Sequence, residues 1–322
     1  MMTRRTRKKG TEEGTEEGRY SAAASSGRSI NEAATGKIRK KEQGSLREAI
    51  GGWLLFVLAL YAAGAAASLM EAAGIERMAR LPVQALIVAA LVVPGACTLY
   101  RRRFGRLPVG MSAGALKKEA AAAICAAGIV LMLTAAGFAL AHGLGWLRLE
   151  GLHVTPALLA GLGINLLTAL LYEALPEELV FRALVPDALR RRMRAAWAFL
   201  LAPLLFVLAP VTVRALQAAT GLGAEPVTAD YLLLLTVFAI ALQSARSAFG
   251  RIGACIGFHL AYLMSARFVV LAAPGEGFVA YTDVEPETGS IVVLFLTVVV
   301  GGAAVFAGLA AIRRKKRIAT DK

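Results

Sequence analysis

Cysteine and histidine are scarce in this sequence, with three of each among 322 residues. Cys97, Cys125 and Cys255 are scattered, and each falls within an apolar run, so they form neither a disulfide framework nor a cysteine metal-binding motif. We expect all three to be buried as small apolar residues. The chain also lacks an HExxH helix, so we expect no stable zinc site and no cofactor, although Glu and His side chains are ligand types that a metal accepts.

Charged residues are few as well, at 18%, whereas 57% of the residues are hydrophobic. A soluble domain of this length would not be so apolar. Apolar runs of roughly 18–22 residues recur, and each is long enough to cross about 30 Å of hydrocarbon as a helix. The predicted fold class is therefore all-α, a polytopic membrane helix bundle of about eight transmembrane helices. Its expected location is the cell membrane, as a multi-pass protein.

The apolar runs divide the chain into a tail and a membrane domain. Residues 1–49 are polar and low in complexity, so we expect a disordered basic cytoplasmic tail. Residues 50–318 form the expected transmembrane domain, with a motif-bearing core over residues 156–267. The predicted spans are 52–70, 83–100, 120–141, 156–175, 195–213, 231–243, 252–270 and 291–312.

The net charge of +14 raises the question of nucleic acid, but the position of the charges favours a membrane role. Basic clusters lie in the tail and at residues 101–106, 190–194, 246–251 and 313–317, separated by two spans each. The loops between them are mixed or acidic. Cytoplasmic loops of membrane proteins carry an excess of Lys and Arg. One orientation therefore satisfies every cluster, with both termini cytoplasmic, and we expect no nucleic-acid partner.

The stretch YEALPEELVFRALV, residues 172–185, places four charged side chains against the fourth span. A charge at the bilayer centre costs about 2.5–3.5 kcal/mol, and ionisable groups at that depth usually have functional partners. Glu178 and Arg182 are four residues apart with the acid first, the favoured order for an ion pair on one helix face. Glu177 points about 100° away and is free to hold a water. Glu173, four residues before Glu177, shares its face.

Pro176 lies inside this stretch and has no amide hydrogen. It is well tolerated at the first position of a helix, so we expect it to start a new helical segment. Glu177 and Glu178 would then occupy the first turn, where the helix dipole favours negative charge. The plainer alternative is a cytoplasmic helix end that carries a surface ion pair.

The segment EELVFRALV fits the EExxxR motif of the CPBP family, which includes CAAX prenyl proteases of the Ras-converting type and bacteriocin-processing or Abi-type intramembrane proteases. The chain resembles this family over residues 156–267. The second family motif is FxxxH, in which Phe206 fits the Phe and Pro210 stands at the His position. The run GRIGACIGFH is similar to the approach to the third motif, HxxxN or HxxxD. It supplies His259, with Leu263 at the Asn or Asp position.

This resemblance implies an intramembrane endopeptidase that hydrolyses a peptide bond of a membrane-associated peptide or protein, in contact with membrane lipid. Glu177 would be the general base that activates a water. Glu178, held by Arg182, and His259 would orient that water and steady the oxyanion. Pro210 cannot donate a hydrogen bond, and one donor lost from an oxyanion site costs about 10²–10³ in rate. A slow enzyme, an enzyme with a replacement donor, and a fold without the chemistry remain as alternatives.

Two other classes of function stay open. The first is a catalytically impaired or inactive protein of the same fold that acts as an immunity or interaction partner, in which His259 merely hydrogen-bonds a neighbouring helix. The second is a transporter, because intramembrane acids also mark ion pathways. A transporter would favour an internal repeat of broken spans, and the two halves of this chain do not echo each other.

Overall fold

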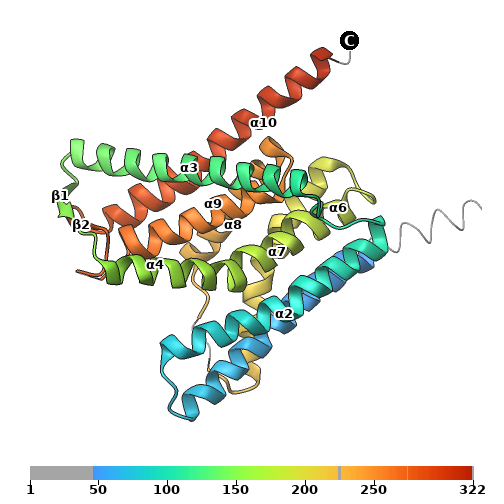
Figure 1. Ribbon diagram of the computed structural model, residues 1–322, viewed down its shortest axis with the longest axis horizontal. Helices are drawn as coiled ribbons and strands as arrows, with labels where there is room; N and C mark the ends of the chain where they lie inside the picture. Colours follow the sequence, from blue (N-terminus) through green and yellow to red (C-terminus); the bar gives the residue numbers. More distant parts are fainter. Residues whose placement is uncertain (1–45, 224–225, 274, 321–322) are drawn as a thin grey trace, which may run out of the picture.

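The computed structural model describes residues 46–223, 226–273 and 275–320 (Figure 1). Within them, eight helices are long and apolar enough to cross a membrane, which confirms the predicted helix bundle. They run over Leu46–Ala72, Arg77–Phe104, Ala113–Gly143, Pro156–Leu189, Ala195–Ala219, Ala229–Phe249, Ile252–Val270 and Gly289–Lys316. The predicted tail lies outside the described residues except for residues 46–49, which belong to the first helix instead.

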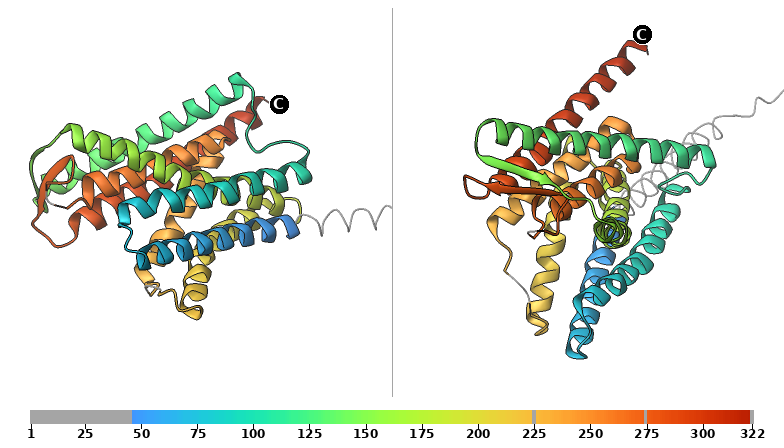
Figure 2. Two further views of the ribbon diagram at one scale, coloured as in Figure 1. Left: turned by 60° about the horizontal axis from the view of Figure 1, so that its bottom comes forward. Right: turned by 60° about the vertical axis from the view of Figure 1, so that its left-hand side comes forward.

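The first helix, Leu46–Ala72, lies side by side with α2, Arg77–Phe104, as a helical hairpin (Figure 2). Two polar contacts fasten this hairpin to the rest of the bundle. The Trp53 indole Nε1–H donates to the Leu205 carbonyl oxygen at 2.8 Å, in helix α7, Ala195–Ala219. The Tyr100 hydroxyl donates to Asp187 Oδ2 at 2.7 Å, at the end of the fourth span. The hairpin is therefore joined to the middle of α7 and to the end of the fourth span.

The fourth span is one continuous helix that contains the EExxxR stretch. The expected α-helical segment begins at Leu175, one residue before Pro176, and has Glu177 and Glu178 in its first turn, but it continues the span and is not a separate helix. Its segments are α4 (Pro156–Ala169), the π-helical η1 (Leu170–Ala174), α5 (Leu175–Glu178), the π-helical η2 (Leu179–Leu184) and α6 (Val185–Leu189). Each π-helical segment ends two residues before a proline, Pro176 or Pro186. In a π-helical turn the hydrogen bond spans an additional residue, as from the Leu175 amide to the Leu170 carbonyl, which gives each proline ring room.

Helix α9, Ile252–Ser265, lies in the centre and packs along α3, Ala113–Gly143. Two glycines of α9, four residues apart, allow this contact. A Cβ at Gly253 would collide with the backbone of Glu119, and one at Gly257 with the backbone of Ala123. Small residues at this spacing let membrane helices approach closely. This close contact with α3 also fixes the position of His259 in the bundle, because His259 follows Gly257 by two residues.

A two-stranded antiparallel sheet caps one end of the bundle, in loops for which the sequence predicted no strand. Strand β1, Leu147–Leu152, pairs with β2, Val279–Asp283, with an irregularity between Leu149 and Gly151. The Tyr281 hydroxyl donates to the Val270 carbonyl oxygen at 2.7 Å, at the end of η3, Ala266–Val270. The last span follows as η4, Gly289–Val300, and α10, Gly301–Thr320.

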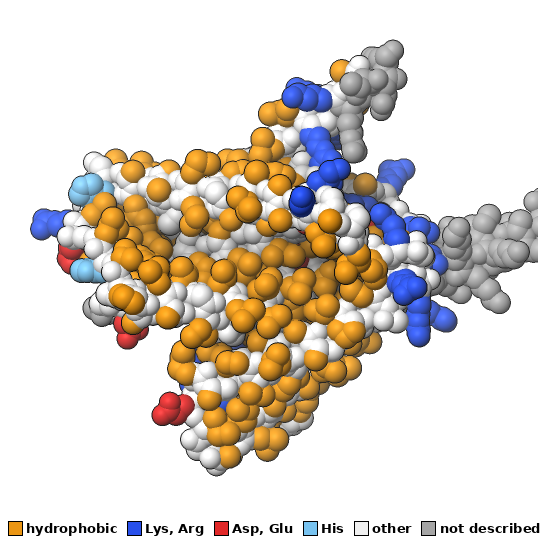
Figure 3. All heavy atoms as spheres, in the orientation of Figure 1, with side chains coloured by type: hydrophobic (Ala, Val, Ile, Leu, Met, Phe, Trp, Pro, Cys, Tyr) orange, Lys and Arg blue, Asp and Glu red, His pale blue; other side chains and the backbone are white. Residues whose placement is uncertain are grey.

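The outer surface is strongly apolar, and its charges gather by sign (Figure 3). Most Lys and Arg side chains on this face cluster at the end of the bundle where α6 and the C-terminal part of α10 lie, whereas His, Asp and Glu side chains and one further basic group appear at the opposite end. Among the cysteines, Cys255 is buried as expected, but Cys97 is only half-buried and Cys125 is exposed. The expectation of burial fails at Cys125 because only one face of α3 packs against α9 and the other faces the membrane.

Candidate active site

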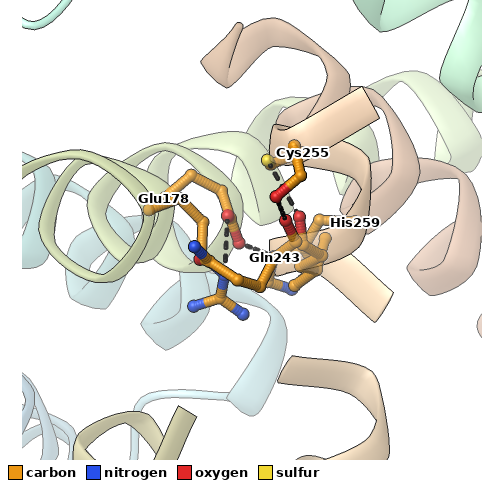
Figure 4. A network of polar contacts seen from close by, with 7 residues as sticks. Glu178, Gln243, Cys255 and His259 are labelled. Atoms are coloured by element: carbon orange, nitrogen blue, oxygen red, sulfur yellow. Dashed lines mark hydrogen bonds and ion pairs between the residues drawn. The ribbon is translucent and has the colours of Figure 1, made fainter. Parts of the chain in front are cut away.

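The EExxxR stretch and α9 meet in a buried ionic cluster. Glu178 is fully buried, and its carboxylate Oε1 lies 3.1 Å from His259 Nδ1 (Figure 4). Its Oε2 lies 3.4 Å from the Nε of Arg182, so the expected ion pair between residues four apart is present. The contact with Glu178 occupies one ring nitrogen of His259 and leaves the other, Nε2, for a further partner.

Arg182 provides the buried positive charge of this cluster and is itself only 2% exposed. Its guanidinium carbon lies 4.6 Å from the centre of the Phe206 ring, in a cation–π contact. Gln243 of α8, Ala229–Phe249, is also fully buried, and in Figure 4 its side chain points toward Glu178. Neither amide atom of Gln243 has a hydrogen-bond partner among the described residues. Glu178, Arg182 and Gln243 are thus enclosed by protein.

A cavity of about 470 Å³ lies beside the cluster, between the first helix, α7, α8 and α9. Glu177 and His259 both line it, although they come from different spans. Glu178 and Arg182 do not line it. The roughly 100° between neighbouring residues of the helix therefore places one carboxylate on the cavity and the other behind His259. A cavity with a few convergent polar groups in an apolar wall is the usual form of a ligand or active site.

Glu173 also lines the cavity, on the face of Glu177, but it is already paired. Its Oε1 lies 2.6 Å from an Arg267 guanidinium nitrogen, and the other terminal nitrogen of Arg267 donates to Asn165 Oδ1 at 3.0 Å. Glu177 is therefore the cavity carboxylate that is left without a cationic partner within ion-pair distance in the described chain.

The position of the second family motif faces the same cavity. Phe206 and Pro210 both line it, so the residue that replaces the expected histidine is in contact with the site. Three tyrosines, Tyr172, Tyr231 and Tyr262, line the cavity too and bring hydroxyl groups to it. Leu263, at the position of the third motif's Asn or Asp, lies on the wall of the cavity without a polar group.

Several cavity residues were missed from the sequence. Arg214, Gln217 and Tyr231 line the cavity, but the predicted spans ended at residue 213 and began at residue 231, so these side chains looked like loop or border residues. The other histidines lie elsewhere, as expected. His142 Nδ1 is 3.3 Å from the Leu147 carbonyl oxygen, and His153 lines a separate hollow beside the two strands.

The same residues form the one acid–histidine group of the described residues whose ligand atoms suit a metal ion. Glu177, Glu178 and His259 each offer one such atom, within 4.8 Å of one another. Both oxygens of Glu178 already face a partner, His259 or Arg182. A metal bound by all three side chains would compete with the contact between Glu178 and His259.

Comparison with known proteins agrees with the motif analysis. Residues 159–265 match the family model described as type II CAAX prenyl endopeptidase Rce1-like. No curated protein and no solved structure gave a match. The matched segment contains Glu177, Glu178, Arg182 and His259, together with most of the cavity wall. It supports a CAAX-type intramembrane protease as the kind of function. Over residues 159–265, this multi-pass membrane protein is therefore similar to the Rce1-like type II CAAX prenyl endopeptidases.

Proposed function

We propose that the protein is an intramembrane endopeptidase of the cell membrane that cleaves a peptide bond of a membrane-associated substrate with a water activated by Glu177. One observation carries the proposal. Glu177 and His259, from separate spans, line one cavity, and Glu178 holds His259 from behind at 3.1 Å. Ionisable groups within a membrane-spanning bundle are energetically costly, and those that occur there usually serve a function.

In the proposed mechanism, the Glu177 carboxylate accepts a proton from water as the water attacks the scissile carbonyl carbon. His259 Nε2 then donates to the developing oxyanion or delivers a proton to the leaving amine, because its Nδ1 is occupied by Glu178. Glu178 fixes the orientation of the imidazole, and Arg182 balances the charge of Glu178. Donors that are held in place before the reaction supply much of the reduction of the barrier.

Pro210 is the observation that favours the second candidate function, a catalytically impaired protein of this fold that acts as an immunity or interaction partner. It faces the cavity at the position of the second-motif histidine and cannot donate a hydrogen bond. Tyr231 and Tyr262 bring hydroxyl groups to the same cavity and are the candidate replacement donors. If one of them takes this role, the enzyme is active without the histidine.

The test uses purified protein in liposomes and a panel of quenched fluorogenic membrane peptides. We expect the parent to cleave at least one peptide, and Glu177→Gln and His259→Ala each to lower kcat by 10²-fold or more, from the usual contribution of acid–base groups. Glu76→Gln, an exposed acid at the start of α2, is the matched control and keeps the parent rate. All variants are first compared for folded yield.

The outcomes separate the two candidate functions. Cleavage that is unchanged in both Glu177→Gln and His259→Ala contradicts the assigned site. A parent without activity that gains cleavage in Pro210→His supports the impaired protein and retains the site. Absence of cleavage in the parent and in Pro210→His contradicts the endopeptidase.

A further inference from the structure

The cavity carries a positive charge at the end away from the ionic cluster. Four residues of α7, Phe206, Pro210, Arg214 and Gln217, line the cavity at helical spacing, so they form one stripe along the helix. Phe206 lies against Arg182 at the catalytic end. Arg214 and Gln217 lie one and two turns beyond Pro210, near the end of α7 at Ala219.

Arg214 is exposed and has no ion pair or hydrogen bond among the residues that the structure describes. The acids of the cavity do not neutralise it, since Glu173 is held by Arg267 at 2.6 Å and no ion pair joins Glu177 to Arg214 in that part of the chain. Arginine within a membrane span almost always faces the bundle interior or a water-filled cavity and marks a substrate or ion pathway.

The groups around Arg214 are neutral hydrogen-bonding groups. Gln217 lies one turn beyond Arg214, and Gln84 of α2 also lines the cavity. The Tyr231 hydroxyl lies within electrostatic reach of both Arg214 and Glu177. Much of the remaining wall is hydrophobic, with Leu60, Leu234 and Leu235 among its side chains. The cavity therefore carries separate charges of opposite sign, Glu177 on the fourth span and Arg214 on α7, in a largely apolar wall.

We propose that Arg214 binds a carboxylate of the substrate and so sets which way an apolar peptide lies across the site. This inference rests on the proposed function. The guanidinium forms a charge-assisted, bidentate pair with a carboxylate, whereas Glu177 repels the same group. A peptide with an apolar body and one carboxylate thus has a single favourable direction in the cavity. The carboxylate belongs to the substrate, as its free C-terminus or as an Asp or Glu side chain.

The plainer role for Arg214 is to reach the water–lipid interface from the end of α7 with its long side chain. That role gives the residue no preference between a carboxylate and a neutral amide on a bound peptide. Binding selectivity for the carboxylate therefore distinguishes the two roles, whereas overall stability does not.

The experiment measures binding rather than cleavage, so a failure of the proposed enzyme activity does not obscure it. Detergent-solubilised full-length protein is titrated with three dansylated leucine-rich peptides that differ only in charge. One has a free C-terminal acid, one a C-terminal amide, and one an internal aspartate with a C-terminal amide. The proteins are the parent, Arg214→Gln, Arg214→Lys, and Arg148→Gln as the matched control, an exposed arginine on β1 outside the cavity.

We expect the parent to bind a carboxylate peptide at least about 10-fold more tightly than the neutral amide, from the usual strength of a hydrogen bond to a charged group. Arg214→Gln removes this preference, Arg214→Lys keeps part of it, and Arg148→Gln retains it. Preference for the free acid or for the internal aspartate identifies the source of the carboxylate. The proposal is overturned if no carboxylate peptide binds the parent more tightly than the amide, or if the preference survives in Arg214→Gln.

Discussion

At the scale of single residues, the buried pair of Glu178 and Arg182 is the least replaceable feature of the site. Both side chains are 2% exposed or less, inside a membrane-spanning bundle. A buried ion pair is weak evidence for stability, because its desolvation cost offsets much of the attraction, but removal of one partner leaves an uncompensated charge. We therefore expect the pair to hold the side chains of the site in position and to contribute little net stability.

The first prediction concerns this pair. Arg182→Met removes the guanidinium and leaves the buried Glu178 carboxylate with His259 as its remaining partner, and we expect the free energy of unfolding to fall by about 3–5 kcal/mol. The double variant Arg182→Met with Glu178→Gln recovers a large part of that loss, because the buried carboxylate charge that lost its guanidinium is removed as well. Unfolding by SDS in mixed micelles measures both.

The surface pair of Arg190 and Asp187 provides the matched control, at 3.5 Å with the arginine side chain 40% exposed. We expect Arg190→Met to cost less than about 1 kcal/mol. If Arg182→Met and Arg190→Met lower the unfolding free energy equally, the buried pair does not have the role assigned to it here.

At the scale of elements, the sequence was sufficient for the spans and insufficient for their irregular parts. Length and hydropathy predicted all eight helices, because a bilayer accepts backbone only when its polar groups are satisfied internally. The π-helical turns before Pro176 and Pro186 were not predictable, since they depend on how the fourth span is held by its neighbours. The pairing of β1 with β2 joins loops more than a hundred residues apart in sequence, and no local pattern marks that contact.

The candidate site, too, was predicted from the sequence only in part. Glu177, Glu178 and Arg182 follow from spacing on one helix, and His259 from its motif. Arg214 did not follow from the sequence, because an arginine at the edge of an apolar run looks like the end of the span. Its place in the cavity is set by α7 continuing to Ala219.

The second prediction concerns the contact of α9 with α3. Gly257→Ala forces a Cβ into the backbone of Ala123, so α9 must shift and carry His259 with it. We expect a loss of about 1–3 kcal/mol in unfolding free energy, the usual cost of overpacking. Gly128→Ala is the matched control, because a Cβ there meets no atom within 4 Å and a helical alanine is favoured over glycine. Equal stability of the two variants would contradict the close approach of the helices.

At the scale of the whole molecule, part of the cavity lies toward the end of the bundle that is opposite the basic clusters. Gly64, Gln84, Gln217 and Tyr231 line the cavity near the ends of their helices, at the hairpin turns of the first helix with α2 and of α7 with α8. The basic clusters lie at the opposite ends of these helices. If the basic end is cytoplasmic, as the positive-inside rule predicts, this part of the cavity faces away from the cytoplasm.

The third prediction tests that orientation in intact cells with a membrane-impermeant maleimide. On a background with Cys97, Cys125 and Cys255 replaced by alanine, we expect Glu150→Cys on β1 to be labelled in intact cells. Arg102→Cys, at the basic end of α2, should be labelled only after the cells are permeabilised, because the excess of Lys and Arg retains that end in the cytoplasm. The reverse pattern would invert the bundle and turn the Arg214 end of the cavity toward the cytoplasm. Gln217→Cys then reports the side from which the cavity is reached, since its side chain lines that end.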